Sequence, residues 1–330
     1  MIKVSVVMAA YNCEKYIDRA IASVLNQTLK EIELIVIEDG STDRTAMMVD
    51  NWTGKDNRIR VLHKANSGHG HSINLGIEMA RGEYIANLDA DDFMDPDMLD
   101  AYYNVAKVME AEVVRGDFMR FIEGESKDET YCNCTEYRSL YYKVLNPQKL
   151  EEGSFKCSHM IWTGIYKREF LNNYHIRCNE AYGATYDDNG FYFQVLCNCR
   201  RMVLANQAGC HYQSDTPGSS TSIANYLAME REYGFIYSYI KTREEFHKFL
   251  PVYWYYYYVN NQFILWRIPE KIRKDYIKHI RALFLSAKKR GELQEFCFGK
   301  HDWDMVLTLM DSADEFEVKL HSHMRIEKRG

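Results

Sequence analysis

The sequence predicts an α/β fold with a mostly parallel, Rossmann-like central sheet that carries helices on both faces, followed by a helical C-terminal region. Two observations support this prediction. Within about the first ninety residues, four strand-like apolar runs alternate with helical patterns, which requires crossover connections and a parallel sheet covered on both faces. From residue 223 onward the chain is rich in Met, Tyr, Leu, Lys and Arg and has few Gly, as in helices. We therefore expect two domains, residues 1–222 and 223–330.

The expected elements of the first domain follow one another in a regular order. Strands are expected at residues 3–10, 33–38, 59–63 and 83–88, because these runs are largely apolar and end in polar loops. Helices are expected at 17–25, 43–52, 73–80 and 96–110. A fifth strand at 113–119 precedes a weakly patterned stretch at 120–157. Regular structure is expected again at 159–166, followed by a helix near residue 188 and short strands at 202–204 and 209–212. Ligands of such sheets bind beyond the carboxyl ends of the strands, so we expect the site in the loops that follow the first four strands.

Composition excludes several classes of protein. With 46% hydrophobic residues the chain can bury a core, so intrinsic disorder is not expected. The 41 Lys and Arg against 47 Asp and Glu leave a net charge of −6, so we expect no nucleic-acid partner. An odd number of cysteines, 9, and no recognisable export signal predict reduced thiols and a cytoplasmic protein. The composition leaves the oligomeric state open.

Three acidic residues, Asp89, Asp91 and Asp92, directly follow the fourth expected strand. Hard oxygen ligands at this spacing can hold Mn²⁺ or Mg²⁺, which in turn can hold a substrate diphosphate. An EF-hand loop is excluded, because Phe93 and Met94 occupy positions that require a ligand and a glycine. Two other interpretations stay open: an acidic turn at a helix N-terminus, and a two-metal nuclease or phosphatase site with further ligands elsewhere.

A glycine-rich loop, Gly68-His69-Gly70-His71, follows the third strand. Ile73 replaces the third glycine of a dinucleotide-binding fingerprint, and the loop does not follow the first strand, so a nicotinamide or flavin site is not expected. The loop can still offer backbone N–H groups to phosphate. His69 and His71 either donate to phosphate or are only solvated.

Two further residues end strands at the same expected edge. Asp39 follows the second strand, where its carboxylate either caps the next helix or accepts a hydrogen bond from a ligand such as a uracil N–H group. Tyr11 ends the first strand, where its ring either lies against a base or covers the edge of the sheet.

Five segments in order resemble those of a known family. They are residues 4–12 (VSVVMAAYN), 21–28 (IASVLNQT), 35–45 (IVIEDGSTDRT), 66–76 (NSGHGHSINLG) and 81–92 (RGEYIANLDADD). Together they resemble the inverting family 2 glycosyltransferases of GT-A fold, especially bacterial enzymes that build capsular, exopolysaccharide or lipopolysaccharide glycans. The resemblance is strong over residues 1–120 and weaker to residue 222. The family often has Pro where this chain has Ala9, a position that contributes mainly its backbone.

The resemblance implies a role for each matched residue. Tyr11 and Asp39 would receive the uracil of a nucleotide sugar, Asp89 the ribose, and Asp91 the metal. The nucleotide-sugar site would also include Ala9, Asn66, Gly68, Ala90, Trp162 and His211. Trp162 would line the sugar pocket, with an ordinary buried Trp as the alternative. His211 would close over the diphosphate together with residues 217–220 and would also contact the metal. Gln213 stands where the family frequently has Arg, so charge neutralisation there would fall to His211 or to the metal.

The catalytic base implied by the resemblance lies in residues 184–191 (ATYDDNGF). The second acid of the pair, Asp188, would take the proton from the acceptor hydroxyl, and its alternative role is a helix N-cap. The sequence does not separate Asp188 from Asp187 in this role.

The function implied is that of a metal-dependent inverting glycosyltransferase. A UDP-sugar would be the donor, and a hydroxyl of a glycan or lipid-linked glycan the acceptor. One alternative is a nucleotidyltransferase that makes nucleotide sugars, which would need a basic glycine-rich loop where residues 11–14 read YNCE. Another is a non-catalytic carbohydrate-binding relic, which the loss of an acidic ligand would favour; none is lost.

The C-terminal region contains an aromatic run at 251–266 (PVYWYYYYVNNQFILW), followed by a basic stretch. Residues 267–290 hold nine Lys or Arg and two Asp or Glu, a local excess of +7. One interpretation is a peripheral contact with an anionic membrane on its cytoplasmic side, with aromatic rings at headgroup depth. The other is that the tyrosines pack this helical module against the catalytic domain or form a dimer contact, and that the basic face is solvated.

Overall fold

The computed structural model describes residues 1–122, 129–150, 153–181, 186–214 and 226–327. The chain divides into two compact units, Met1–Ser219 and Ser220–Gly330. The domain boundary expected at residue 222 and the loop at 217–220 lie outside the described residues. No helix in the described ranges is both long enough and apolar enough to cross a bilayer.

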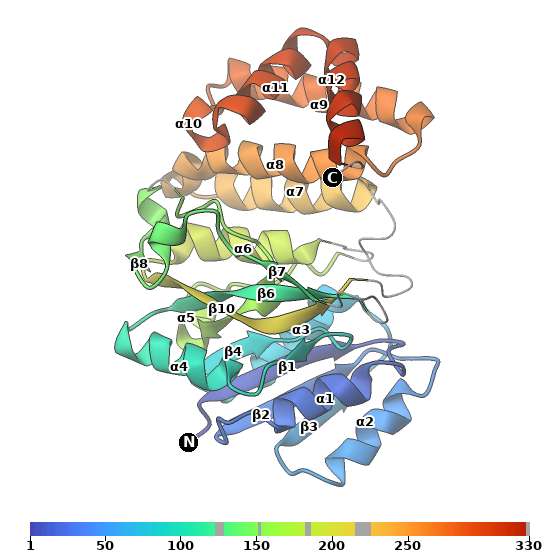
Figure 1. The fold of residues 1–330 in the computed structure, drawn as a ribbon, viewed down its shortest axis with the longest axis vertical. Helices are drawn as coiled ribbons and strands as arrows, with labels where there is room; N and C mark the ends of the chain where they lie inside the picture. The colour runs from blue at the N-terminus through green and yellow to red at the C-terminus, as the bar shows by residue number, and fades with distance from the viewer. Residues whose placement is uncertain (123–128, 151–152, 182–185, 215–225, 328–330) are drawn as a thin grey trace. The chain divides into compact units, whose positions relative to one another are not determined.

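The first unit is built on a ten-stranded sheet in the order β3-β2-β1-β4-β9-β6-β10-β5, with β7 beside β6 and β8 beside β10 (Figure 1). The first four strands in this order are parallel: β1 (Val4–Ala10), β2 (Ile32–Glu38), β3 (Ile59–His63) and β4 (Tyr84–Asn87). The largely apolar runs of β1, β2 and β4 suit strands that are buried on both faces, whereas β3, at the end of this order, is only partly buried. The predicted α/β class is therefore confirmed, and the carboxyl ends of these strands meet at one edge.

The other half of the sheet mixes parallel and antiparallel pairs. It contains β5 (Phe93–Met94), β6 (Val113–Phe121), β7 (Glu129–Cys132), β8 (Val144–Leu145), β9 (Gly164–Lys167) and β10 (Met202–Gln213). β9 runs antiparallel to both β4 and β6. The two short strands expected at 202–204 and 209–212 are one strand, because the register shifts between Ala205 and Cys210 absorb the polar residues between them.

Helices cover both faces of this sheet (Figure 1). They are α1 (Ile17–Leu25), α2 (Thr45–Thr53), α3 (His69–Met79), α4 (Met98–Val108), α5 (Arg168–Asn173) and α6 (Asp187–Asn198). The apolar faces of α1 and α4 share a core with Val4, Val6 and Met8 of β1. On the opposite face, Gly76 of α3 lies so close to β1 that a Cβ there would be 2.2 Å from Val7 Cγ1. α3 begins at residue 69 instead of 73, so the glycine- and histidine-rich segment is its first turn.

The second unit is helical, as predicted. Its α-helices are α7 (Tyr226–Lys241), α8 (Leu250–Leu265), α9 (Glu270–Lys289), α10 (Glu295–Phe298), α11 (Lys300–Asp311) and α12 (Ala313–Glu327). Most of the aromatic run of α8 is buried, and the Tyr253 ring lies 5.6 Å from that of Tyr233 and 6.1 Å from that of Tyr257. Trp254 donates to Glu292 at 3.1 Å. These contacts all lie within the second unit, so the aromatic run forms part of the core of the helical module itself.

Candidate active site

The acidic residues that follow β4 form one cluster. Asp89, Asp91 and Asp92 each offer a carboxylate oxygen, and these oxygens lie within 4.8 Å of one another. Asp92 is fully buried; its Oδ1 accepts from the Gln213 N–H of β10 at 2.8 Å, and its Oδ2 has no hydrogen-bond partner among the described residues. Burial, together with the charges of Asp91 and Asp89, raises the pKa of Asp92 well above its usual range. Three hard oxygen donors and an unsatisfied buried oxygen fit a Mg²⁺ or Mn²⁺ ion.

Arg19 of α1 anchors this acidic loop. Its Nη2 donates to the Asp91 carbonyl at 2.9 Å and to Gln213 Oε1 at 2.6 Å, and its guanidinium lies 4.4 Å from the centre of the Phe93 ring. Charge neutralisation near Gln213 was predicted to come from His211 or from the metal. The structure adds Arg19, which is 194 positions from Gln213 and becomes its neighbour only through the tertiary fold.

His211 and Trp162 lie in aromatic surroundings. Nε2 of His211 is 3.0 Å from Asp95 Oδ1, and its ring stacks on that of Phe93 at 4.3 Å. His211 is not a member of the acidic cluster, so a direct metal contact from it stays a prediction. Trp162 is buried and stacks on Tyr212 at 5.3 Å, which fits an ordinary packed Trp. Its place in a sugar pocket also stays a prediction.

The acidic pair opens α6. Asp187 is buried, whereas Asp188 is half-buried. Removal from water and the nearby charges of Asp187 and Asp89 raise the pKa of Asp188 to about 7, although His69 counteracts this shift. A carboxyl group with a pKa near the working pH can accept and release a proton readily. The choice of Asp188 over Asp187 as the catalytic base stays a prediction.

His69 connects the acidic cluster with the acidic pair. As the first residue of α3, it places Nδ1 3.0 Å from Asp187 Oδ2 and Nε2 3.4 Å from Asp89 Oδ1. Partial removal from water alone would lower the pKa of His69, but Asp187 and Asp89 outweigh this effect and raise it well above its usual value. The imidazolium form has a proton on each nitrogen, so it can donate to both carboxylates. From the sequence, His69 was expected to be a phosphate donor or a solvated loop residue, and its partner Asp187 could not be foreseen because it is 118 positions away.

A second hydrogen-bonded link joins α3 to the segment before the acidic pair. Asn74 Nδ2 donates to the Cys178 carbonyl at 3.0 Å, and Asn74 Oδ1 accepts from the Cys178 N–H at 2.8 Å. The same Nδ2 donates to Glu180 Oε1 at 2.7 Å. An amide side chain that meets both backbone groups of one residue fixes that segment against the helix. Sequence reasoning did not single out Asn74, whose partners come from a distant segment.

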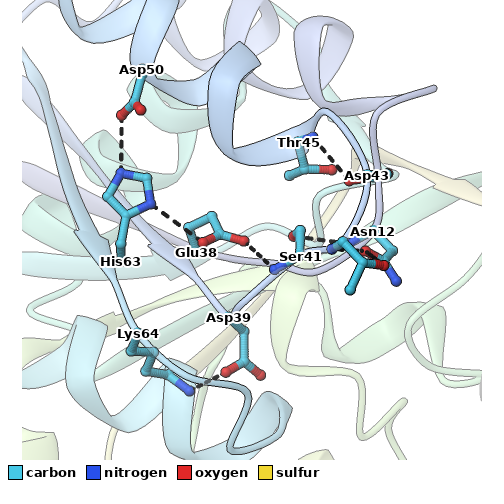
Figure 2. A network of polar contacts seen from close by, with 10 residues as sticks. Asn12, Glu38, Asp39, Ser41, Asp43, Thr45, Asp50, His63 and Lys64 are labelled. Atoms are coloured by element: carbon cyan, nitrogen blue, oxygen red, sulfur yellow. Dashed lines mark hydrogen bonds and ion pairs between the residues drawn. The ribbon is translucent and has the colours of Figure 1, made fainter.

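Asp39 organises the loop that leads into α3. Its Oδ1 accepts from the Lys64 ammonium and from the Ser67 N–H at 2.9 Å, and its Oδ2 accepts from the Gly68 N–H at 3.0 Å. Figure 2 shows the Lys64 side chain pointing at this carboxylate. Asp39 is therefore held by the loop after β3 and does not cap the helix that follows β2. Its role toward a uracil stays a prediction.

The other predicted nucleotide-site residues lie around the same sheet edge. Tyr11 is 50% exposed just beyond β1, whose penultimate residue is Ala9. Asn66 approaches Gly40, where the positive φ of 71° suits glycine; a Cβ there would lie 2.8 Å from the Asn66 nitrogen. Ala90 is buried within the acidic loop.

A polar network extends from the end of β2 (Figure 2). His63 Nδ1 lies 3.3 Å from Glu38 Oε2, and His63 Nε2 lies 2.9 Å from Asp50 Oδ1. Glu38 is buried and also accepts from the Ser41 N–H at 2.6 Å. Desolvation opposes the charged form of His63, but Asp50 and Glu38 outweigh it and raise the pKa of the imidazole.

Comparison with known proteins agrees with this geometry. The family described as "Glycosyl transferase family 2" matches residues 5–173. Glycosyltransferase GlyG of Streptococcus pneumoniae is 30% identical over 210 residues, which cover 62% of this chain and 68% of GlyG. Chondroitin synthase of Pasteurella multocida is 39% identical over 97 residues, 29% of this chain and 10% of that protein.

The fold is also found among solved structures. S. aureus TarS 1-349 in complex with UDP-GlcNAc superimposes with a TM-score of 0.71 at 16% identity, covering 98% of this chain and 92% of that one. Its UDP complex gives the same TM-score. This likeness confirms the GT-A fold, and the family match covers the strands that carry the acidic cluster. The chain therefore belongs to glycosyl transferase family 2 and is a glycosyltransferase.

Proposed function

We propose that this enzyme transfers a sugar, with inversion, from a nucleotide-diphosphate sugar to a hydroxyl group during polysaccharide synthesis, and that the donor is a UDP-sugar. One observation carries the proposal: a metal-competent acidic cluster lies next to an acidic pair in which Asp188 has a pKa of about 7. Electrostatic support for a leaving diphosphate and a base for an incoming hydroxyl are the two requirements of this reaction.

The donor site consists of the sheet edge described above. Tyr11 and Asp39 receive the base, Asp89 the ribose, and Asp91 with its neighbours holds a Mn²⁺ or Mg²⁺ ion. The ion, when bound, supplies Lewis-acid stabilisation of the diphosphate charge. Ala9, Asn66, Gly68, Ala90, Trp162 and His211 complete the site. The TarS complexes with UDP and UDP-GlcNAc support a nucleotide donor for this fold.

The chemistry itself needs a single displacement. Asp188 accepts the proton of the acceptor hydroxyl while that oxygen attacks the anomeric carbon. The bond between the anomeric carbon and the diphosphate oxygen breaks, and its electron pair leaves with the nucleotide diphosphate. Attack from the face opposite the leaving group inverts the anomeric centre, and no covalent sugar–enzyme intermediate forms.

A donor screen tests the proposal. Thermal stabilisation of the full chain is measured with UDP-, GDP- and CDP-sugars, each with Mn²⁺, with Mg²⁺ and with chelator. We expect UDP-sugars to stabilise most and only in the presence of a divalent ion, and the best donor to be hydrolysed slowly and transferred to a glycan acceptor. Stabilisation by GDP- or CDP-sugars alone would overturn the UDP assignment, and equal donor affinity in chelator would remove the metal.

The acceptor is a glycan or a lipid-linked glycan, and we place the enzyme in the cytoplasm with a peripheral contact to anionic lipid through α9. Lys271, Lys274 and Lys278 are exposed on this helix, whereas Arg273 is buried and donates to the Ile268 carbonyl at 2.9 Å. The contact would therefore be electrostatic, because most of the neighbouring aromatic rings are buried.

Vesicle flotation tests this contact. Binding to anionic but not to neutral vesicles is expected, and both salt and the triple change of these lysines to Gln should weaken it. Recovery of the wild-type chain in the unbound fraction with both kinds of vesicle would show a solvated basic face.

A further inference from the structure

We propose that His69 is a positioning residue. Its Nδ1 holds Asp187 of the acidic pair and its Nε2 holds Asp89 of the acidic cluster, so that the proposed base is kept at a fixed place relative to the donor site. Nδ1 contacts Asp187 Oδ2 at 3.0 Å, and Nε2 contacts Asp89 Oδ1 at 3.4 Å. One ring therefore joins Asp89, at the strand end proposed to bind the donor, to Asp187, the residue of α6 that directly precedes the proposed base Asp188. The inference rests on the proposed function and adds a residue to it.

The surroundings of His69 leave little freedom for this link. A Cβ on Gly70 would lie 2.4 Å from the Asn179 carbonyl and 2.9 Å from Asp187 Oδ2, so the first turn of α3 lies directly against the acidic-pair segment. Asn74, one turn further along α3, bonds both backbone groups of Cys178. The first two turns of α3 thus fix the position of the segment that precedes the acidic pair, and His69 connects the same turns to Asp89.

The two arms of the link differ in burial. The Asp187 side chain is 8% exposed, whereas the Asp89 side chain is 34% exposed. Within the described ranges, the ion pairs of Asp187 involve only His69. Loss of the His69–Asp187 contact leaves a buried carboxylate without its counter-charge. This should lower stability more than loss of the His69–Asp89 contact, which water can replace.

Two substitutions separate the arms. In His69→Asn the side-chain amide can reach the place of Nδ1 and keep the Asp187 contact, whereas in His69→Gln the longer amide reaches the place of Nε2 and keeps the Asp89 contact. Both are compared with His69→Ala, which loses both arms. The matched control is His175→Asn, an exposed histidine whose φ of 51° Asn readily adopts.

Kinetics and stability are then measured on the full chain, using the donor and acceptor found in the screen. We expect His69→Asn to raise the donor KM about tenfold with little change in kcat, and His69→Gln to lower kcat about tenfold or more with little change in donor KM, because misplaced reacting groups cost rate. In chelator, the melting temperature should fall in the order wild type, Asn variant, Gln variant. The control should match the wild type in all three quantities.

The outcomes separate this inference from the proposed function. The positioning role would be overturned if the wild type transfers sugar but the Asn and Gln variants share the same kinetic defect or have none. Absence of transfer by the wild type would overturn the proposed function. In that case the melting temperatures still test the contact between His69 and Asp187. If the Asn variant is no more stable than the Gln variant, Nδ1 is not the nitrogen that stabilises the buried Asp187.

Discussion

Asp188 and its neighbour Asp187 differ in surroundings although they are adjacent in the chain. Asp187 is engaged by His69, whereas the Asp188 carboxyl has a pKa raised to about 7 by burial and by nearby acids. We expect Asp188→Asn to lower kcat by about 10² or more while donor affinity is kept, since a positioned base supplies roughly that factor. Asp187→Asn should have a milder effect. Steady-state kinetics would show the opposite order if Asp187 were the base.

The same pKa gives the expected pH dependence. A general base acts in its ionised form, so kcat of the wild type should fall as the pH drops below about 7. Stability runs the other way: the folded-state pKa of Asp188 is raised above 3.8, so this group favours folding at low pH and that contribution is lost as the pH rises through about 7. Asp188→Asn should therefore melt at or above the wild-type temperature at pH 8, which excludes unfolding as the cause of lost activity.

His63 gives a pH dependence of stability that does not involve the reaction. Its pKa is raised because contacts with Asp50 and Glu38 outweigh desolvation. Its contribution is present below the unfolded pKa and is lost as the pH rises through the folded pKa. We expect His63→Gln to be destabilised at pH 5.5 but not at pH 8.5, by well under ~1 kcal/mol because the side chain is 44% exposed and screened by water. Denaturant melts at the two pH values, with His175→Asn as control, measure this; an equal difference at both would contradict it.

The packing of α3 against β1 determines where His69 lies relative to the acidic residues. A Cβ on Gly76 would lie 2.2 Å from Val7 Cγ1, whereas a Cβ on Gly54, at the end of α2, meets its nearest neighbour at 3.9 Å. We expect Gly76→Ala to destabilise the first unit by about 1–3 kcal/mol through overpacking. Gly54→Ala should be close to neutral. Chemical denaturation measures both, and a neutral Gly76→Ala would mean that α3 can move away from β1 without cost.

The sequence predicted the parallel half of the sheet well because its signals are local. β1 to β4 are within one residue of the expected ranges at either end, since each is a short apolar run that stops at a polar loop. Regular structure was expected at residues 159–166, but the position of β9 between β4 and β6 was not foreseen, because only tertiary pairing gives the four residues Gly164–Lys167 their place. The start of α3 was misplaced by four residues, because glycines and histidines do not form an apolar helical pattern.

For the candidate site, the sequence could name groups but not their partners. The cluster of Asp89, Asp91 and Asp92 was predicted because its members are adjacent in the chain and follow a strand. The contacts of Arg19 with Gln213 and of His69 with Asp187 join distant segments, so no spacing rule could indicate them. The difference between Asp187 and Asp188 also depends on burial, which adjacent identical residues do not reveal.

For the protein as a whole, the acidic cluster should make thermal stability depend on divalent ions. Three carboxylates within 4.8 Å repel one another, and an ion that binds only the folded state stabilises it by mass action. We expect excess Mn²⁺ to raise the melting temperature by several degrees, a size that follows from about 1–2 kcal/mol in a chain of this length. Without metal, Asp91→Asn should melt at or above the wild-type temperature, because one of the repelling charges is gone, and it should lose the response to Mn²⁺.

Chelator reverses the expected shift, and Asp311→Asn on α11 serves as the control because its side chain is exposed in the other unit. An Asp91→Asn variant that still responds fully to Mn²⁺ would place the ion elsewhere.

The position of β10 has a consequence for how the enzyme is made. The acidic loop after β4 is held by hydrogen bonds to β10: the backbone N–H of Gln213 donates to Asp92 Oδ1 at 2.8 Å, and the backbone N–H of Asp95 donates to the Gly209 carbonyl at 2.8 Å. Asp92 and Gln213 are separated by 121 positions, so the acidic loop is synthesised long before the strand that holds it. The β1 to β4 half can begin to fold during synthesis, since domains form from the N-terminus as they emerge. A nascent chain that ends before β10 has the acidic residues but lacks the strand that holds their loop. We therefore expect no activity until translation of the first unit is almost complete.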